Sequence, residues 1–559
     1  MSSLLHPSLP LLLGVAAMPL AGAGARRVLT LLATTIALAM VLLLPRDASI
    51  ALRLLDMDLE PLRADALGRV MAVAFTLFSV MASLFGWGRT SRGAQAASLA
   101  LAAAGVGVVL AGDLLSMMLA WELLAVSSMF LVWTAGPHAH GAGYRYIIFH
   151  LIGGLFLLAG VVSHLQYAGS LAIVPMDPSA PGAWLVLIGV AINAAVPPLH
   201  AWLPDAYPRA TPVGTVFLSA FTTKSAVCIL LRLFAGYDVL VWAGAAMALY
   251  GVIFAVLEND IRRLLSYHIV SQVGYMVCGV GMGTALSLNG TTSHAFCHIF
   301  YKGLLLMSAA AVIHATGRGK LTELGHIAKP LRLTLAFMLI GAFSISGVPL
   351  LNGFVSKSMV VTAAAEAHLP AIEFMLVCAS VGTFLSIALK MAWYAFFGLA
   401  EQPPCRVQQH VPATMVAGMA LASAMCIVTG LFPDLLYRYL PYRADYHPYT
   451  ANHVLTALQL LAATTLVFCF FHRSLAGRAT ITLDVDRLYR RPLALALDLG
   501  GALVVGISSS AERAVAWLIA AARDGWLATH ETTRRLPLAQ KIALVALFFA
   551  GLWLLCRMA

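Results

Sequence analysis

Residues 191–202 read Ala-Ile-Asn-Ala-Ala-Val-Pro-Pro-Leu-His-Ala-Trp, and they interrupt an apolar run that begins near residue 183. Proline lacks the backbone donor of a helix and clashes with the preceding turn, so Pro197 and Pro198 should end the helix. A break of this kind survives at membrane depth only where protein or a water-filled cavity satisfies the freed backbone groups. The stretch therefore predicts a discontinuous helix inside a membrane protein.

A second interrupted run lies at residues 346–357, which read Ser-Gly-Val-Pro-Leu-Leu-Asn-Gly-Phe-Val-Ser-Lys, with the break at Pro349. Segments 196–202 and 348–354 align with each other, Val-Pro on Val-Pro and Trp on Phe. Paired interrupted helices are typical of transporters that are built from two internal repeats and hold their site between them.

The rest of the chain has the composition of a membrane protein. Of its 559 residues, 61% are hydrophobic and only 11% are charged, whereas globular proteins have about 45–50% apolar and about 25% charged residues. The net charge of +11 does not indicate nucleic-acid binding, because the basic residues lie between apolar runs, as in the loops of membrane proteins. The sequence predicts an all-α polytopic membrane protein with about 14–17 transmembrane helices.

The apolar runs divide the chain into six predicted segments. These are N-terminal transmembrane helices at 1–94, a first repeat at 95–236, a second repeat at 237–400, further transmembrane helices at 401–471, an amphipathic interfacial segment at 472–538 and a final transmembrane helix at 539–559. The first two runs, 8–24 and 28–45, are expected to form a hairpin of spans and not a signal peptide, because no basic stretch precedes them. In the interfacial segment, charged residues among apolar ones favour a helix along the membrane surface, with a flexible loop as the alternative.

The eight cysteines lie singly, without a Cys-x-x-Cys pair, which argues against a disulfide framework, an iron–sulfur cluster or attached haem. His294 and His298 are spaced to bind one metal ion, but no third ligand can be placed from the sequence. We expect neither a cofactor nor a bound metal in this chain.

Five charged residues lie inside apolar runs, where each costs at least about 2.5–3.5 kcal/mol to insert. They are Glu122, Lys224, Lys302, Lys357 and Lys390. His294, His298 and Lys302 repeat every fourth residue and share one helix face. Burial generally favours the neutral form of a lysine and a nearby carboxylate favours the charged form, while histidine titrates near neutral pH, so the set suits a proton relay. For any single residue, the alternatives are an interfacial position or a structural ion pair.

Several motifs occur in order between about residues 95 and 400. They are Trp121-Glu122, Pro-Leu-His-Ala-Trp-Leu-Pro-Asp-Ala at 198–206, Asn-Asp-Ile-Arg-Arg-Leu-Leu-Ser-Tyr at 259–267, His-Ile-Phe-Tyr-Lys-Gly-Leu at 298–304 and Gly-Phe-Val-Ser-Lys at 353–357. In these motifs the chain resembles the proton-translocating antiporter-like subunits of respiratory complex I and of Mrp-type Na+/H+ antiporters. Residues 303–317 and 388–398 are most similar to the Mrp D subunit. The resemblance implies two inverted five-helix repeats with discontinuous helices, a central polar chain, a C-terminal lateral amphipathic helix and a final transmembrane helix.

In the first repeat, the resemblance implies that Glu122 is the fifth-helix carboxylate that tunes a partner lysine and that Lys224 is the eighth-helix lysine that links inward. Asn193 stands where the family usually has that partner lysine, and an amide carries no proton as a cation. Either Lys224 becomes the partner of Glu122, or the first half-channel is degraded or differently coupled. Arg262 also replaces a usual lysine and releases a proton less readily.

In the second repeat, the resemblance implies that His294, His298 and Lys302 form the relay of the eleventh helix. Lys357 follows the broken twelfth helix and faces the exit, and Lys390 matches a lysine of the Mrp-like branch.

We expect a proton-translocating subunit of a multisubunit monovalent cation/proton antiporter in a bacterial inner membrane. The alternatives are a proton-pumping subunit of a complex I-like NADH-quinone oxidoreductase or membrane-bound hydrogenase, and a scaffold with an inactive channel. The sequence contains no nucleotide or redox motif, so other subunits would supply any redox chemistry. Expected partners are other membrane subunits, the lipid bilayer, protons and, as a further candidate ion, Na+, but no nucleic acid.

Overall fold

The computed structural model describes residues 5–476 apart from 55–56, 400–402 and 444, and only short pieces beyond residue 476. It contains two compact units, Met1–Thr482 and Leu483–Ala559. In the second unit the described pieces are mostly helical, such as the exposed residues 512–517. Most of the predicted interfacial segment 472–538, and all of the predicted final span 539–559 except residue 540, lie outside the described residues.

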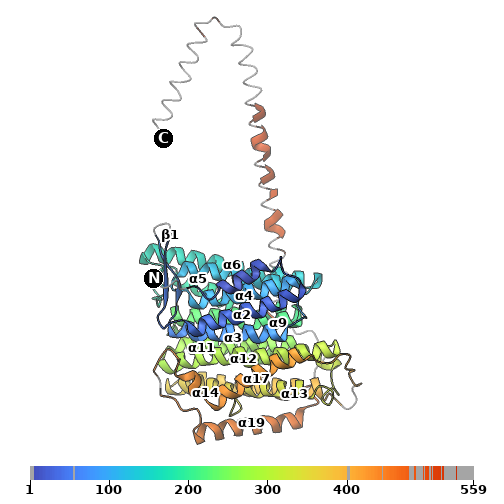
Figure 1. The fold of residues 1–559 in the computed structure, drawn as a ribbon. Helices are drawn as coiled ribbons and strands as arrows, with labels where there is room; N and C mark the ends of the chain where they lie inside the picture. Colours follow the sequence, from blue (N-terminus) through green and yellow to red (C-terminus); the bar gives the residue numbers. More distant parts are fainter. Residues whose placement is uncertain are drawn as a thin grey trace. The chain divides into compact units, whose positions relative to one another are not determined.

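The first unit is a bundle of helices packed side by side (Figure 1). Its helices are α1 (Leu9–Ala17), α2 (Ala23–Leu43), α3 (Ala66–Phe85), α4 (Arg92–Leu110), α5 (Leu114–Trp133), α6 (Pro137–Ala168), α7 (Ala183–Asn193), α8 (Trp202–Ala206), α9 (Pro212–Leu233), α10 (Asp238–Leu257), α11 (Ile261–Met282), α12 (Ala285–Thr316), α13 (Arg332–Ser346), α14 (Asn352–Glu366), α15 (Pro370–Thr383), α16 (Ala392–Phe396), α17 (Ala413–Leu431), α18 (Asp434–Tyr437) and α19 (Ala451–Phe471). A π-helical turn, η3 (Phe384–Met391), joins α15 to α16, and short 3-10 turns occur at η1 (Tyr207–Arg209) and η2 (Leu321–Glu323).

Within the described residues, 11 helices are long and apolar enough to cross a membrane, with α15 to α16 counted as one. Two further apolar helices, α7 and α13, are shorter because each precedes a break. The all-α polytopic fold that the sequence predicts is confirmed.

Two features of the N-terminal region differ from the prediction. The first helix, α1, ends at Ala17 although its apolar run continues to residue 24, and nine helical residues cover only about 14 Å. Between α2 and α3 the chain forms an antiparallel hairpin of β1 (Ser49–Leu54) and β2 (Met57–Arg63), where the sequence predicted only a connection. The hairpin is fastened to the bundle by Gly112 N, which donates to Glu60 O over 2.8 Å.

The helices from α4 to α9 and from α10 to α15 repeat one arrangement. In each set the first two helices pack against each other, the third has 32 residues (α6 and α12), and the fourth is interrupted (α7–α8 and α13–α14). Each set crosses the bundle five times, counting the interrupted pair as one crossing. Because five is odd, the second set starts at the opposite end of the bundle, and the two repeats are inverted.

Both helix breaks contain the prolines that the sequence analysis identified. Pro197 and Pro198 lie between α7 and α8, and Pro349 lies between α13 and α14. Each break also places a non-glycine residue in the left-handed region, Ala195 at φ 60° and Leu350 at φ 75°. Such conformations cost free energy and are retained where the surrounding structure imposes them.

The bundle has two chemically different ends. We call the end that carries β1 and β2 the hairpin end, and the other the opposite end. Basic residues gather at the opposite end: Arg26, Arg27, Arg89, Arg92, Arg145, Arg209, Arg262, Arg263, Arg318, Lys320, Lys329, Arg332 and Arg406. At the hairpin end, acidic residues are numerous: Asp47, Asp58, Glu60, Asp65, Asp113, Asp177, Asp238, Glu366, Glu373, Asp434 and Asp445.

Candidate functional site

Two enclosed helices carry four of the predicted relay residues. Every residue of α9 from Val213 to Leu233 is buried, and so is nearly all of α12. Helix α12 packs against α9, α11, α13 and α14, and in Figure 1 it lies between α3 and α17. Lys224 on α9 and Lys302 on α12 are fully buried, which excludes an interfacial position for either side chain.

Lys224 is held by uncharged oxygens. Its Nζ donates to Ser219 O over 2.7 Å and to Thr223 Oγ1 over 3.1 Å. Among the described residues, no carboxylate lies within ion-pair distance of this ammonium group. The alternative of a structural ion pair is therefore not observed for Lys224.

Of the three predicted relay residues of α12, His294 contacts α14 and Lys302 contacts α11. His294 Nδ1 lies 3.1 Å from Ser356 Oγ of α14, and its Nε2 lies 3.3 Å from the hydroxyl of Tyr301. The rings of His294 and His298 are 6.3 Å apart, and both residues are fully buried. Lys302 Nζ donates to a carbonyl of α11 over 3.3 Å.

His298 is the least satisfied residue of this group. Both of its ring nitrogens are buried, and neither has a hydrogen-bond partner within the part of the chain that the structure describes. Buried polar atoms of this kind commonly bind ordered water. His298 is thus suited to exchange protons with water molecules on either side of its ring.

Lys357 joins the two halves of the second broken helix. From α14 its Nζ donates to Ile345 O of α13 over 2.6 Å, and it lies 3.5 Å from Ser380 Oγ. The ammonium also sits 5.2 Å from the centre of the Tyr275 ring, a cation–π arrangement. A cavity of about 370 Å³ opens beside this side chain.

Lys390 has a different environment in the π-helical turn η3. Its Nζ donates to Val256 O and, over 3.1 Å, to Glu258 O, at the C-terminal end of α10. A cation at that position is favoured by the free carbonyls and the dipole of α10. The turn also contacts the relay side of the bundle, because Ser386 Oγ lies 2.8 Å from His268 Nε2 of α11.

Glu122 and Asn193 differ from the lysines. Glu122 is half-exposed on α5, and a Cβ added to Gly154 of α6 would come within 2.2 Å of its Oε1. Glu122 and Lys224 form no ion pair. Asn193 is fully buried at the end of α7, and neither atom of its amide has a hydrogen-bond partner among the described residues.

Several buried polar residues near the relay were missed by the sequence reasoning. Besides His268, they include Tyr146, whose hydroxyl lies 3.3 Å from Thr222 Oγ1, and His150, which stacks on Tyr146 with ring centres 4.0 Å apart. A polar residue inside an apolar run was the available signal. That signal is weak, because single histidines and tyrosines are often buried in proteins without a functional role.

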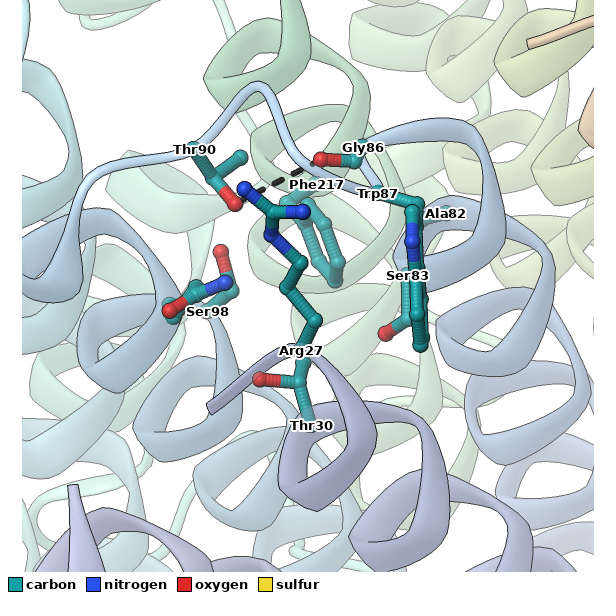
Figure 2. Close-up of a pocket in the computed structure, with 10 residues that line it drawn as sticks. Arg27, Thr30, Ala82, Ser83, Gly86, Trp87, Thr90, Ser98 and Phe217 are labelled. Carbon is teal, nitrogen blue, oxygen red and sulfur yellow. Dashed lines mark hydrogen bonds between the residues drawn. The ribbon is translucent and has the colours of Figure 1, made fainter. Parts of the chain in front are cut away.

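Two other findings bear on ligands. Within the described chain there is no group of three or more His, Cys, Asp and Glu residues that could hold a metal ion. Figure 2 shows a separate hollow where Arg27 of α2 meets Trp87 and Thr90, which includes none of the predicted relay residues. Its volume of about 10 Å³ admits at most one water molecule.

Comparison with known proteins places the chain in a family. Residues 111–386 match the family model described as NADH:quinone oxidoreductase/Mrp antiporter, TM. An uncharacterized protein of Methanocaldococcus jannaschii is 32% identical, with 60% of this chain and 73% of that protein covered. NADH-quinone oxidoreductase subunit N of Desulforudis audaxviator is 30% identical, with 68% of this chain and 82% of that protein covered.

The fold is also found in a solved structure. A chain of the Mrp complex from Dietzia sp. DQ12-45-1b superposes with a TM-score of 0.75 at 24% identity. The match covers 89% of this chain but only 60% of the Mrp chain, which is therefore considerably longer. The family match, the two relatives and the shared fold lead to one conclusion: this chain belongs to the NADH:quinone oxidoreductase/Mrp antiporter family of membrane subunits.

Proposed function

We propose that this chain moves protons across a membrane as a subunit of a multisubunit monovalent cation/proton antiporter. The observation that carries the proposal is the set of three buried lysines, Lys224, Lys302 and Lys357, on three helices joined by packing of α12 against both α9 and α14. All three donate to carbonyl or hydroxyl oxygens, and no carboxylate within the described residues pairs with them. An ammonium group buried without a counter-charge is costly, which favours transfer of its proton to a neighbouring acceptor.

The histidines of α12 provide the connections. His298 lies one helical turn from both His294 and Lys302 on one face of α12, and His294 contacts Ser356, the residue before Lys357. In each step one N–H bond breaks and another forms, with water carrying the proton between side chains. The ion gradients across the membrane, or the partner subunits of the complex, determine the direction in which the protons move.

The proposed proton relay is tested by replacing its lysines. The purified complex is reconstituted into vesicles with a trapped pH dye, and a Na+ or K+ gradient is applied. We expect Lys224→Ala and Lys357→Ala to slow proton movement by about 10²-fold or more, because each removes a proton carrier from a dry segment. Lys329→Ala, at an exposed lysine, is the matched control and should transport normally.

Size-exclusion profiles of the complex separate lost transport from lost assembly. Full transport in both Lys224→Ala and Lys357→Ala would contradict the relay. A wild-type complex that assembles but moves no protons under any driving force would favour the scaffold interpretation.

A second candidate is a proton-pumping subunit of a redox complex. The observation that favours it is the match to NADH-quinone oxidoreductase subunit N over 82% of that protein. The two candidates differ in what drives transport. An antiporter acidifies or alkalinises the vesicle with a cation gradient alone, whereas a redox subunit requires an electron donor and its partner subunits.

The proposal also covers the membrane in which the chain lies and the orientation of the chain in it. The basic residues at the opposite end of the bundle are those expected on the cytoplasmic side of a membrane. We infer that the chain lies in a bacterial inner membrane, with the opposite end in the cytoplasm, the hairpin end outside, and other membrane subunits around it. Protons, and Na+ or K+ as the exchanged cation, are the proposed ions.

A further inference from the structure

His150 of α6 is a fully buried titratable residue that the proposed relay of lysines does not use. Its Nδ1 lies 2.9 Å from the carbonyl oxygen of Tyr146, one turn earlier in the helix. Because a carbonyl oxygen only accepts, Nδ1 carries the hydrogen, and the neutral ring keeps its lone pair on Nε2. Nε2 is buried and has no hydrogen-bond partner in the described part of the chain. This nitrogen is therefore a proton acceptor inside the bundle.

His150 lies at the first helix break. Its ring packs edge-on against the ring of Trp202, the first residue of α8, with ring centres 4.6 Å apart. Trp202 Nε1 donates to Ile192 O over 2.9 Å, and Ile192 precedes Asn193, the last residue of α7. The break thus brings together two buried polar groups, His150 Nε2 and the Asn193 amide, that find no partner among the described residues.

The face of α6 that carries His150 reaches from α9 to α5. Tyr146 stacks on the ring of His150 and places its hydroxyl 3.3 Å from Thr222 Oγ1 of α9. Gly154, one turn after His150, adjoins Glu122 of α5, because a Cβ added to the glycine would collide with that carboxylate. Residues 146, 150 and 154 share one helix face. His150 therefore lies on α6 between the contact with α9 and the contact with Glu122.

The neighbouring helices also carry buried polar atoms without a partner in the described chain. Helix α5 contributes Trp121 Nε1, and α9 contributes Ser225 Oγ, the atom next in sequence to Lys224. Helices α5 and α7 each pack against both α6 and α9. Buried polar atoms of this kind commonly bind ordered water. We therefore expect water between these helices, where Glu122 and Lys224 form no ion pair.

We propose that His150 is the proton carrier that links Glu122 to Lys224 in the first repeat. The protonated Glu122 carboxyl group gives its proton through water to His150 Nε2, so that one O–H bond breaks and one N–H bond forms. The imidazolium then gives a proton through water to the neutral amine of Lys224, and the ring returns to its neutral form. That protons move along this chain rests on the proposed function, whereas the access of water to His150 does not.

The access of water is tested first, without any transport measurement. The assembled complex is incubated in D2O, and deuterium at carbon C2 of each histidine ring is measured by mass spectrometry of its peptides. This hydrogen exchanges where water reaches the ring and the ring can be protonated. We expect exchange at His150, with His138, exposed at the start of α6, as the reference.

Absence of exchange at His150 after His138 has exchanged completely would show a dry ring and overturn the proposal. Because this measurement needs neither an ion gradient nor a substitution, its failure is distinguishable from failure of the proposed function.

The carrier role is tested in the dye-loaded vesicles. We expect His150→Gln to slow proton movement by about tenfold or more, because glutamine keeps polar atoms in place but takes up no proton. His138→Gln, at an exposed histidine of the same helix, is the matched control and should transport normally. We expect the double variant His150→Gln and Asn193→Lys to recover most of the lost rate, because lysine restores a titratable group at the same break.

Two outcomes would overturn the assignment of His150. One is wild-type transport by His150→Gln. The other is a loss that Asn193→Lys does not restore in an assembled complex, because a ring needed only for packing would give that result. A wild-type complex that moves no protons would instead contradict the proposed function, and the carrier role with it.

Discussion

Asn193 is the last residue of α7, where the helix breaks and where the resemblance to antiporter-like subunits implies a lysine. Its amide is fully buried, and neither the oxygen nor the nitrogen has a protein partner in the described chain. Since Lys224 forms no ion pair with Glu122, the interpretation in which Lys224 replaces the missing lysine gains no support from the contacts. The other interpretation is a first half-channel that is degraded or differently coupled, in which we expect Asn193 to bind water and not to carry a proton.

This interpretation predicts unequal losses of proton movement on substitution of Asn193 and of Lys224. We expect Asn193→Ala to reduce proton movement only a few-fold, because it removes a water ligand, whereas Lys224→Ala removes a carrier and costs about 10²-fold or more. Dye-loaded vesicles measure both rates, and the amount of assembled complex is compared for each variant. An equal or larger loss of proton movement in Asn193→Ala would show that the Asn193 amide is itself indispensable for proton transfer through bound water.

The charged members of the site could be predicted because a charge in an apolar run is conspicuous within a few residues of sequence. His268 could not, because its significance depends on Ser386, a hydrogen-bond partner 118 residues away. The environment of Glu122 could not be predicted from the sequence either, because the exposure of its side chain on α5 depends on how α6 packs beside it. The assignments of relay roles to these residues stay predictions.

Helices α10 and α11 show how closely backbones approach in this bundle. A Cβ on Gly274 of α11 would lie 2.5 Å from Ala248 N and 2.7 Å from Gly244 O, both backbone atoms of α10. Backbone atoms cannot move aside as the end of a side chain can. Small residues at such crossings are typical of helix packing in membranes.

We therefore predict that Gly274→Ala destabilises the protein by about 1–3 kcal/mol through overpacking, although alanine is the better helix former. A thermal melt of the detergent-solubilised protein should show a lower transition temperature. Gly24→Ala is the control, because no atom lies within 4 Å of a Cβ at Gly24, and its melt should be unchanged or slightly raised. An unaltered melt for Gly274→Ala would mean that α10 and α11 are farther apart than described.

Helix positions followed from the apolar runs, because length and hydrophobicity alone define a span. The predictions that were wrong concern short segments of the chain. The β1–β2 hairpin was missed because its strands are short and lie in a connection, and α1 ends early although its apolar run continues beyond Ala17. The π-helical turn η3 has no sequence signature of its own, and its Lys390 contacts the end of α10, 132 residues away in the sequence.

At the scale of the whole bundle, the two ends differ in charge, and this difference is the basis of the proposed orientation in the membrane. Arginine and lysine predominate at the opposite end and acidic residues at the hairpin end. Short basic loops are retained on the cytoplasmic side during insertion. The orientation decides which side of the membrane the hairpin end of the bundle faces.

We predict that the loop between α18 and α19, at residues 438–450, lies outside the cytoplasm and that the loop between α16 and α17, at residues 403–412, lies inside it. Alkaline phosphatase folds only outside and green fluorescent protein fluoresces only inside, so fusions truncated after residue 442 and after residue 409 should give opposite signals. The second fusion is the internal control, because α17 separates the two sites by one crossing. The reversed pattern would place the basic end outside the cytoplasm and would contradict the orientation inferred from the charges.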